Sequence, residues 1–171
     1  MAPFVLDASM TLSWCFADEA TPYSRAVLAA LRTTYAVVPT LWPFEIANSL
    51  AVAERRSRIN QDQIAEFLET LRRLPIQVER REAVWLCQAI IRLAREQRVT
   101  AYDAAYLDLA KREQLTLATL DHDLQVAGLA LGNVFRGAGN QYAPAAIAAF
   151  RPEIDHPVGS FDHVKIVLDD D

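Results

Sequence analysis

Short apolar runs alternate with longer segments of helical periodicity over the first 135 residues of this chain. Four runs have the length and apolar content of buried strands: residues 4–7, 35–38, 76–78 and 115–118. Apolar residues at helical spacing predict helices over residues 9–16, 21–32, 44–56, 60–74, 82–97, 102–113 and 121–131. Strands that alternate with helices predict a parallel sheet with helices on both faces, so the fold class is α/β.

Residues that favour helix starts lie at several of these boundaries. Thr21 stands before Pro22, which supplies a cap and a proline at the first helical position. Asn60 with Gln63 three residues later has the form of a capping box, in which each side chain binds the other residue's backbone amide. Thr100 is the predicted cap of the next helix but one.

The pattern changes after residue 136. Gly137 begins a cluster of turn-forming residues, three prolines follow, and the chain ends in three aspartates. We therefore predict a folded domain over residues 1–136 and a C-terminal extension over residues 137–171. A last strand of the domain is predicted at Val134 and Phe135, and the extension has one candidate edge strand, Ser160–Leu168.

The composition is that of an ordinary soluble globular protein, with 52% hydrophobic and 23% charged residues. No run of 18 apolar residues occurs, and the N-terminus lacks the basic region of a signal peptide. Cys15 and Cys87 lie in apolar helical segments, which indicates packed thiols and a reducing compartment. We expect no membrane association and a cytoplasmic location.

The net charge of −5 is unevenly distributed. Residues 151–171 hold 6 acids and 2 bases, so the C-terminal extension carries most of the negative charge. Ten arginines fall between Arg55 and Arg98, against six acids. They predict either a nucleic-acid track, because arginine binds phosphate in a bidentate manner, or solvated helix faces with pairs such as Glu69–Arg73.

Four acids occupy positions that an α/β fold brings together. Asp7 ends the first apolar run, and Asp121 follows the run that begins at Leu115. Both are expected at the carboxyl ends of parallel strands, where open α/β sheets bind their ligands. Glu45 and Asp103 are expected in the first turns of helices, and the N-termini of crossover helices lie at the same edge.

Carboxylates gathered at one edge repel one another. A pair of charges ~4 Å apart costs about 4 kcal/mol at an effective dielectric constant of about 20. The cluster therefore predicts a bound cation, and hard oxygen ligands favour Mg²⁺ or Mn²⁺. The usual chemistry of these two ions is performed on phosphoryl groups.

Each acid also has a purely structural interpretation. Asp7 could cap the helix predicted from Ser9, although Ser9 could also cap that helix or bind the acid. Glu45 could be a first-turn acid that favours the helix dipole, but it lies in an apolar segment, where an acid usually has a partner.

The two later acids have capping alternatives. Asp103 completes a capping box with Thr100, an interpretation as strong as that of a ligand. Either Asp121 or Asp123 is expected to cap the following helix. Asp121 is nearer the strand, so we rank it first as a site residue and Asp123 as a helper, and we leave His122 out of the site.

Several other α/β classes do not fit. A receiver domain needs adjacent acids after its first strand, and a haloacid-dehalogenase-type phosphatase needs Asp-x-Asp, whereas this chain has Asp7 followed by Ala8 and Ser9. No Gly-x-Gly-x-x-Gly, Gly-Lys-Ser/Thr or Gly-x-Ser-x-Gly sequence occurs, which disfavours dinucleotide folds, nucleoside-triphosphate folds and serine hydrolases.

Four blocks resemble, in order and spacing, the motifs of PIN-domain nucleases: Phe4–Ser9, Pro43–Asn48, Thr100–Leu107 and Leu117–Asp121. The sequence over residues 100–107, TAYDAAYL, is the most specific. The resemblance is greatest to the VapC toxins of toxin–antitoxin pairs, and it covers residues 4–135. Members usually end near Phe135, so the C-terminal extension departs from the pattern.

The resemblance implies a three-layer α/β/α domain with a central, mostly parallel sheet and an endoribonuclease activity that needs Mg²⁺ or Mn²⁺. It implies that the four acids hold the metal and that the hydroxyls of Ser9 and Thr119 support the site. It also implies a homodimer and a VapB-like antitoxin that covers the groove. Four arginines are our hypothesis for binding the RNA backbone: Arg72, Arg73, Arg80 and Arg81.

Two other functions stay open. A PIN-fold module without catalysis would bind RNA or protein, although the presence of all four acids favours an enzyme. A housekeeping nuclease that processes RNA is the other alternative. The small size and the lack of an additional RNA-binding domain favour the toxin.

Overall fold

The structure is a computed structural model that describes residues 2–80 and 83–132. Four strands form in this part of the chain: β1 (Phe4–Leu6), β2 (Ala36–Val38), β3 (Ile76–Val78) and β4 (Thr116–Ala118). Seven helices accompany them: α1 (Ala8–Leu12), α2 (Pro22–Ala30), α3 (Trp42–Arg55), α4 (Gln61–Arg73), α5 (Ala83–Gln97), α6 (Ala101–Glu113) and α7 (His122–Ala130). The alternation predicts these elements correctly to within a few residues.

The four strands form one parallel sheet in the order β3-β2-β1-β4. Phe4 of β1 pairs with Ala36 of β2 and with Thr116 of β4, and Ala36 also pairs with Ile76 of β3. All three residues of β1 are fully buried, whereas β3 at the edge is largely exposed. Strands covered on both faces carry continuous apolar runs, which explains why the first apolar run becomes a central strand.

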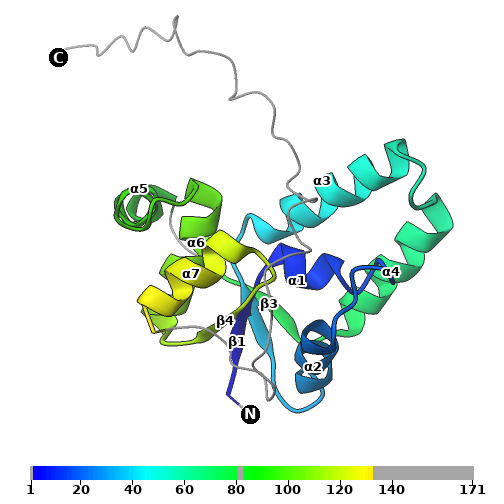
Figure 1. The fold of residues 1–171 in the computed structure, drawn as a ribbon, viewed down its shortest axis with the longest axis horizontal. Coiled ribbons are helices and arrows are strands. Elements are labelled where there is room, and N and C mark those ends of the chain that lie inside the picture. Colours follow the sequence, from blue (N-terminus) through cyan, green and yellow to red (C-terminus); the bar gives the residue numbers. More distant parts are fainter. Residues whose placement is uncertain (1, 81–82, 133–171) are drawn as a thin grey trace, which may run out of the picture.

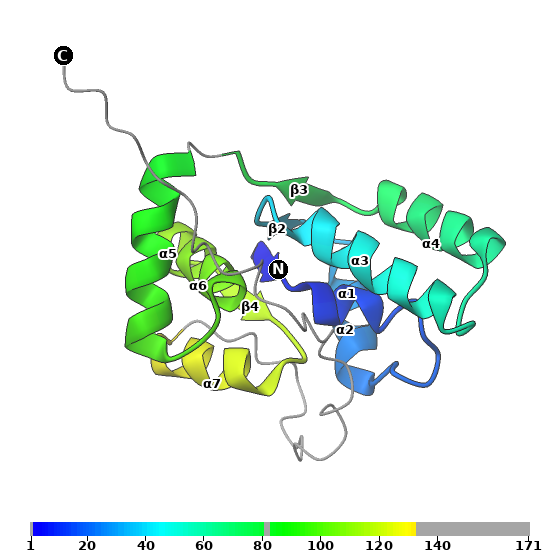
Figure 2. The same cartoon turned by 90° about the horizontal axis from the view of Figure 1, so that it is seen from above.

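Helices cover both faces of this sheet, as predicted. Figures 1 and 2 show α5, α6 and α7 on one side and α1 to α4 on the other. Helix α6 packs directly on β1 and β4, and α5 and α7 pack against α6. The predicted three-layer α/β/α architecture is therefore confirmed.

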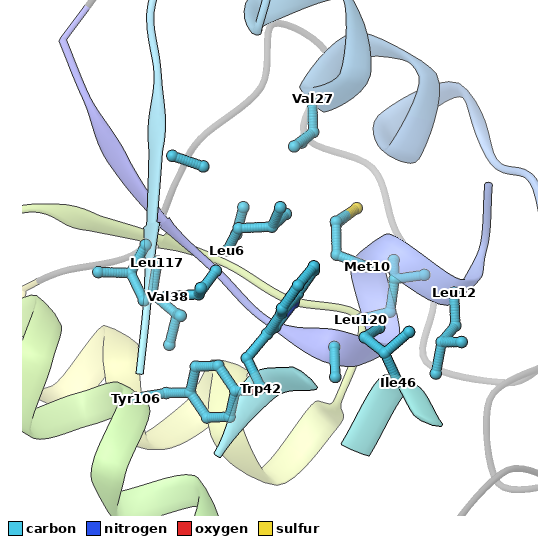
Figure 3. Close-up of a cluster of buried hydrophobic side chains, with 14 of the residues drawn as sticks. Leu6, Met10, Leu12, Val27, Val38, Trp42, Ile46, Tyr106, Leu117 and Leu120 are labelled. Atoms are coloured by element: carbon cyan, nitrogen blue, oxygen red, sulfur yellow. The ribbon is translucent and has the colours of Figure 1, made fainter. Parts of the chain in front are cut away.

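The core lies between the sheet and the helices on each side. Figure 3 draws part of it, with Tyr106 of α6 beside Trp42 of α3, and with Leu6 of β1, Leu117 of β4 and Ile46 of α3 in the same cluster. The helical periodicity places these apolar side chains toward the sheet, so burial of apolar surface holds the layers together.

The local start signals are confirmed, and one boundary is wrong. Capping boxes begin α2, α4 and α6, including the predicted pair of Asn60 and Gln63. The first helix ends at Leu12, not at Phe16, and the Ser13 hydroxyl donates to the Met10 carbonyl at 2.7 Å. A hydroxyl that binds a nearby carbonyl competes with the helix.

Three expectations lie beyond the described residues. They are the last strand at Val134 and Phe135, the edge strand Ser160–Leu168 and the boundary between the domain and the C-terminal extension. In the described ranges, no helix has both the length and the apolar character that crossing a membrane requires.

Candidate active site

The four acids come from segments that end at the carboxyl edge of the sheet. Asp7 directly follows β1, and Asp121 lies three residues after the end of β4. Glu45 lies in the first turn of α3, which follows β2, and Asp103 lies in the first turn of α6. The structure brings these carboxylates within electrostatic range of one another, with Asp7 acting on Glu45 and with Asp103 and Asp121 acting on Asp7.

Asp7 is the most deeply buried member of the cluster, with 6% of its surface exposed. Its backbone stands at the N-cap of α1, but its side chain makes no capping hydrogen bond. Instead, Asp7 Oδ2 accepts hydrogen bonds from the hydroxyls of Ser9 and Thr119, the latter at 2.7 Å. The capping interpretation of the Asp7 side chain is therefore wrong, and the two predicted hydroxyls do contact it.

These two hydroxyls also join Asp7 to the segment after β4. The Leu120 amide donates to Ser9 Oγ at 3.0 Å, and the Asp121 amide donates to Thr119 Oγ1 at 3.0 Å. Each hydroxyl thus accepts from a backbone amide of one segment and donates to the carboxylate of another. The network fixes the Asp7 side chain relative to Asp121 across two neighbouring strands, β1 and β4.

Glu45 has a partner that the sequence analysis missed. The hydroxyl of Tyr106, which is 1% exposed, donates a hydrogen bond to Glu45 Oε2. The apolar residues around Tyr106 in the sequence predict only a buried aromatic side chain of the core. The sequence feature that could have indicated its place near the site is its spacing of three residues from Asp103, because residues at this spacing share one face of a helix.

Asp103 and Asp121 each cap a helix. Asp103 Oδ2 accepts from the Thr100 hydroxyl at 2.7 Å, and the Thr100 hydroxyl oxygen accepts from the Asp103 amide at 3.1 Å. Asp121 Oδ1 accepts from the Leu124 amide at 2.8 Å at the start of α7. Asp123 is exposed in the first turn of that helix, so Asp121 is the capping residue of the two.

Burial and the clustering of the acids raise the pKa values of Asp7 and Glu45. Burial raises the pKa of Asp7 from 3.8 to about 6. The hydrogen bonds from Ser9 and Thr119 oppose this shift, and the charges of Asp121 and Asp103 add to it. Burial likewise raises the pKa of Glu45 from 4.5 to about 7; Tyr106 opposes this shift, and Asp7 adds to it. Both carboxylates are therefore costly to ionise where they stand, which is the situation that a bound cation relieves.

The donor set fits a hard divalent cation by its chemistry, since it consists of carboxylate oxygens at a partly buried edge. The side-chain directions fit less well. In the described residues, no three His, Cys, Asp or Glu side chains surround a common point as metal ligands do. The hydrogen bond from Thr100 accounts for part of this, because it holds one oxygen of Asp103 at the helix start.

A comparison with known protein families identifies the family of this fold. A family model described as PIN domain matches residues 4–129. This chain belongs to the PIN domain family. The match spans β1 to α7, so all four acids lie within the PIN domain. PIN domains are generally metal-dependent nucleases that act on nucleic acids.

A solved structure has the same fold. The crystal structure of PAE2754 from Pyrobaculum aerophilum superposes with a TM-score of 0.57, at 21% sequence identity, over 74% of this chain and 84% of that chain. At this identity the likeness shows the fold and not the activity. A search of curated protein sequences found no match.

The predicted RNA-binding arginines of this PIN domain do not lie together. Arg72 and Arg73 end α4 and both pair with Glu69, at 2.8 and 3.0 Å, so the alternative of ion pairs along a helix face is confirmed for them. They precede the first residue of β3 and thus lie at the edge opposite the acids. Arg80 is exposed beyond the carboxyl end of β3, and Arg81 is outside the described residues.

Proposed function

We propose that this PIN domain is a metal-dependent endoribonuclease and that Asp7, Glu45, Asp103 and Asp121 hold Mg²⁺ or Mn²⁺. One observation carries the proposal. A buried carboxylate, Asp7, and a half-buried one, Glu45, have raised pKa values, and the charges that act on them are those of the other acids. Burying acids in this way is unfavourable unless a ligand compensates the charge, so the arrangement points to a functional site.

The residues have separate tasks in this proposal. A bound divalent ion supplies hydroxide from water near neutral pH and neutralises charge on the phosphate. Ser9 and Thr119 hold the Asp7 carboxylate in one orientation through its Oδ2 atom. Asp103 would hold the ion with an oxygen released from Thr100, and Asp121 would hold it with the oxygen that does not cap α7.

The decisive test is cleavage of a mixed pool of transfer and ribosomal RNA by the full chain. We expect specific fragments with Mn²⁺ or Mg²⁺ and none with EDTA. Asp7→Asn and Asp103→Asn should each lower the cleavage rate by at least about 100-fold, because each removes a charged ligand. Asp62→Asn is the matched control, since Asp62 is an exposed first-turn acid of α4.

A binding module without catalysis is the second candidate. The observation that favours it is the lack of a closed group of three ligand side chains among the described residues. It predicts RNA binding without cleavage at any metal concentration or pH, with no Mn²⁺ binding by calorimetry. Fragments that disappear with EDTA would exclude it.

The biological role that we propose is that of a VapC-like toxin acting in the cytoplasm. Its expected partners are an RNA substrate, a second copy of the chain and a VapB-like antitoxin. Expression should arrest growth, and Asp7→Asn should abolish the arrest. A short reading frame directly upstream that encodes a DNA-binding protein would support the toxin role, whereas accumulation of unprocessed RNA after gene deletion would support the housekeeping alternative.

A surface on this domain suits an antitoxin segment. An apolar groove of about 490 Å³ lies between α3, α4 and β3, with Ile46, Leu50 and Leu68 among its lining residues. Leu68 is 46% exposed, so it is accessible to a partner. Leu68→Asp should weaken antitoxin binding at least 10-fold and leave RNA cleavage unchanged, because Leu68 lies on α4 away from the acids.

A further inference from the structure

Tyr106 contacts Glu45 and lies near the start of α1, which follows Asp7. Its hydroxyl donates a hydrogen bond to Glu45, and the backbone amide of Ala8 is near enough to oppose the rise in the hydroxyl's pKa that burial causes. The hydroxyl thus lies between the β1–α1 junction and the first turn of α3. The β1–α1 junction precedes the crossover from β1 to β2, and α3 follows it. Tyr106 lies on α6, 61 residues after Glu45.

The position of the hydroxyl is fixed by the ring that carries it. Tyr106 is 1% exposed and is part of the core cluster with Trp42, which begins α3 (Figure 3). Core side chains pack closely and occupy single rotamers. A donor held in this way restricts the carboxylate that accepts from it, whereas a free Glu45 side chain would be driven away by the charges of Asp7 and Asp103.

We infer that Tyr106 is a positioning residue that holds Glu45 at a set distance from Asp7 so that both carboxylates face one cation. The inference rests on the proposed metal-binding function. Because the hydroxyl donates to Oε2 of Glu45, the other carboxylate oxygen, Oε1, would be the one that contacts a bound ion. Outer partners of metal ligands act in this manner, and their loss usually lowers metal affinity or activity about 10- to 100-fold.

A packing role alone would not require the hydroxyl. Phenylalanine fills nearly the same volume and keeps the ring in the core, but it removes the hydrogen bond to Glu45. A stability effect is therefore expected from either role. Metal affinity is the property that distinguishes them, because it changes only if the hydroxyl orients a ligand.

The test compares Mn²⁺ binding by the full-length wild-type chain and the Tyr106→Phe variant, using calorimetry well below the unfolding temperature of both. We expect about 10- to 100-fold weaker binding in the variant. Tyr35→Phe is the matched control, since Tyr35 precedes β2 at the opposite edge of the sheet and should bind Mn²⁺ as the wild type does. Equal affinity in Tyr106→Phe and wild type would overturn the inference.

A double-mutant cycle shows whether Tyr106 acts through Glu45. In a Glu45→Gln background, Tyr106→Phe should cause less than a twofold further loss of Mn²⁺ affinity, because the side chain that it orients no longer ligates as a carboxylate. A further loss as large as in the wild-type background would contradict an action through Glu45.

A structure of the Mn²⁺-bound wild type keeps the inference testable if Tyr106→Phe does not fold. The Tyr106 hydroxyl should bind one oxygen of Glu45 while the other contacts the ion, and a Glu45 side chain that leaves Tyr106 on metal binding would overturn the inference. Failure of the proposed nuclease function has a different signature. In that case Mn²⁺ binding would depend on Tyr106, but the protein would cleave no RNA. A wild type that binds no Mn²⁺ would refute both the nuclease function and the positioning role of Tyr106.

Discussion

At the scale of single residues, the raised pKa values of Asp7 and Glu45 make stability depend on pH. The folded chain keeps protons on these groups where the unfolded chain has released them. Their contribution to the free energy of unfolding is therefore full below about pH 4 and is lost as the pH rises to about 7. The ionisation of these two groups should therefore make the metal-free protein less stable at pH 8 than at pH 5.

Asp7→Asn tests this linkage. Asparagine keeps an oxygen acceptor for Ser9 and Thr119 but has no charge to desolvate, so the variant should exceed the wild type in stability by about 3 kcal/mol at pH 8. Urea unfolding in EDTA measures this difference, which should shrink toward pH 4. Adding Mn²⁺ at pH 8 should stabilise the wild type and not the variant. A stability difference that does not vary with pH would contradict the burial argument.

The sequence predicts the gathering of the four acids at one edge of the sheet better than it predicts the directions of their side chains. Asp7 is recognisable because a carboxylate directly follows a fully apolar run, and the structure shows why that run is a central strand. The direction of Asp103 is not predictable, because ligation and capping require the same residue type at the same position. The contact of the Tyr106 hydroxyl with Glu45 is not predictable from the sequence, because it forms only when the fold brings the two residues together.

At the scale of elements, α6 begins with a capping box that competes with the site for Asp103. Thr100→Ala removes the cap and should lower the free energy of unfolding by about 1 kcal/mol. It also removes the hydrogen bond that Asp103 would have to give up to bind a metal in the proposed site. We therefore expect Mn²⁺ affinity to rise several-fold, as measured by calorimetry.

Asn60→Ala is the control for this prediction. Asn60 forms the same kind of capping box with Gln63 at the start of α4, away from the acids. Both variants should lose similar stability, but only Thr100→Ala should bind Mn²⁺ more tightly. Weaker Mn²⁺ binding by Thr100→Ala would mean that the cap helps to hold Asp103 in place for the metal.

The ends of β3 separate the candidate RNA-binding arginines. Arg80 follows the strand at the edge where the acids lie, whereas Arg72 precedes it and is paired with Glu69. For single-stranded RNA, losing one phosphate contact lowers the slope of log affinity against log salt by about 0.7. Arg80→Ala should produce this change and Arg72→Ala a smaller one, as measured by fluorescence anisotropy. Unchanged RNA binding in both variants at low salt would exclude these arginines from the interface.

Element boundaries are predictable where local chemistry decides them. Asn60 and Thr100 begin helices as their side chains indicate, since a capping box needs only residues that are close in sequence. The end of α1 at Leu12 is less accessible, because apolar residues continue to Phe16 and the hydrogen bond of Ser13 to Met10 is not visible in the hydrophobic pattern.

At the scale of the whole molecule, the acidic C-terminal extension over residues 137–171 is the feature without a counterpart in the resemblance. We propose that it packs along a second copy of the chain or covers basic surface. Deletion of residues 140–171 should therefore change the oligomeric state or raise RNA affinity, by light scattering and anisotropy respectively. A truncated chain that matches the full chain in both measurements would exclude these two roles.

The layered architecture follows from the alternation of strands and helices, but the strand order does not. The pattern fixes neither which strand is central nor that β1 pairs with both β2 and β4. That order depends on contacts between segments more than a hundred residues apart, such as Phe4 with Thr116. It also decides that Asp7 lies between Glu45 and Asp121.

The double use of acids as helix caps has a consequence for how such chains diverge. Asparagine caps helices as well as aspartate does, so a single exchange at Asp121 would keep the start of α7 while removing a charge from the site. On the proposed function, a single exchange of this kind would therefore separate folding from catalysis at little cost in stability, and the stability of the fold alone would not require these acids.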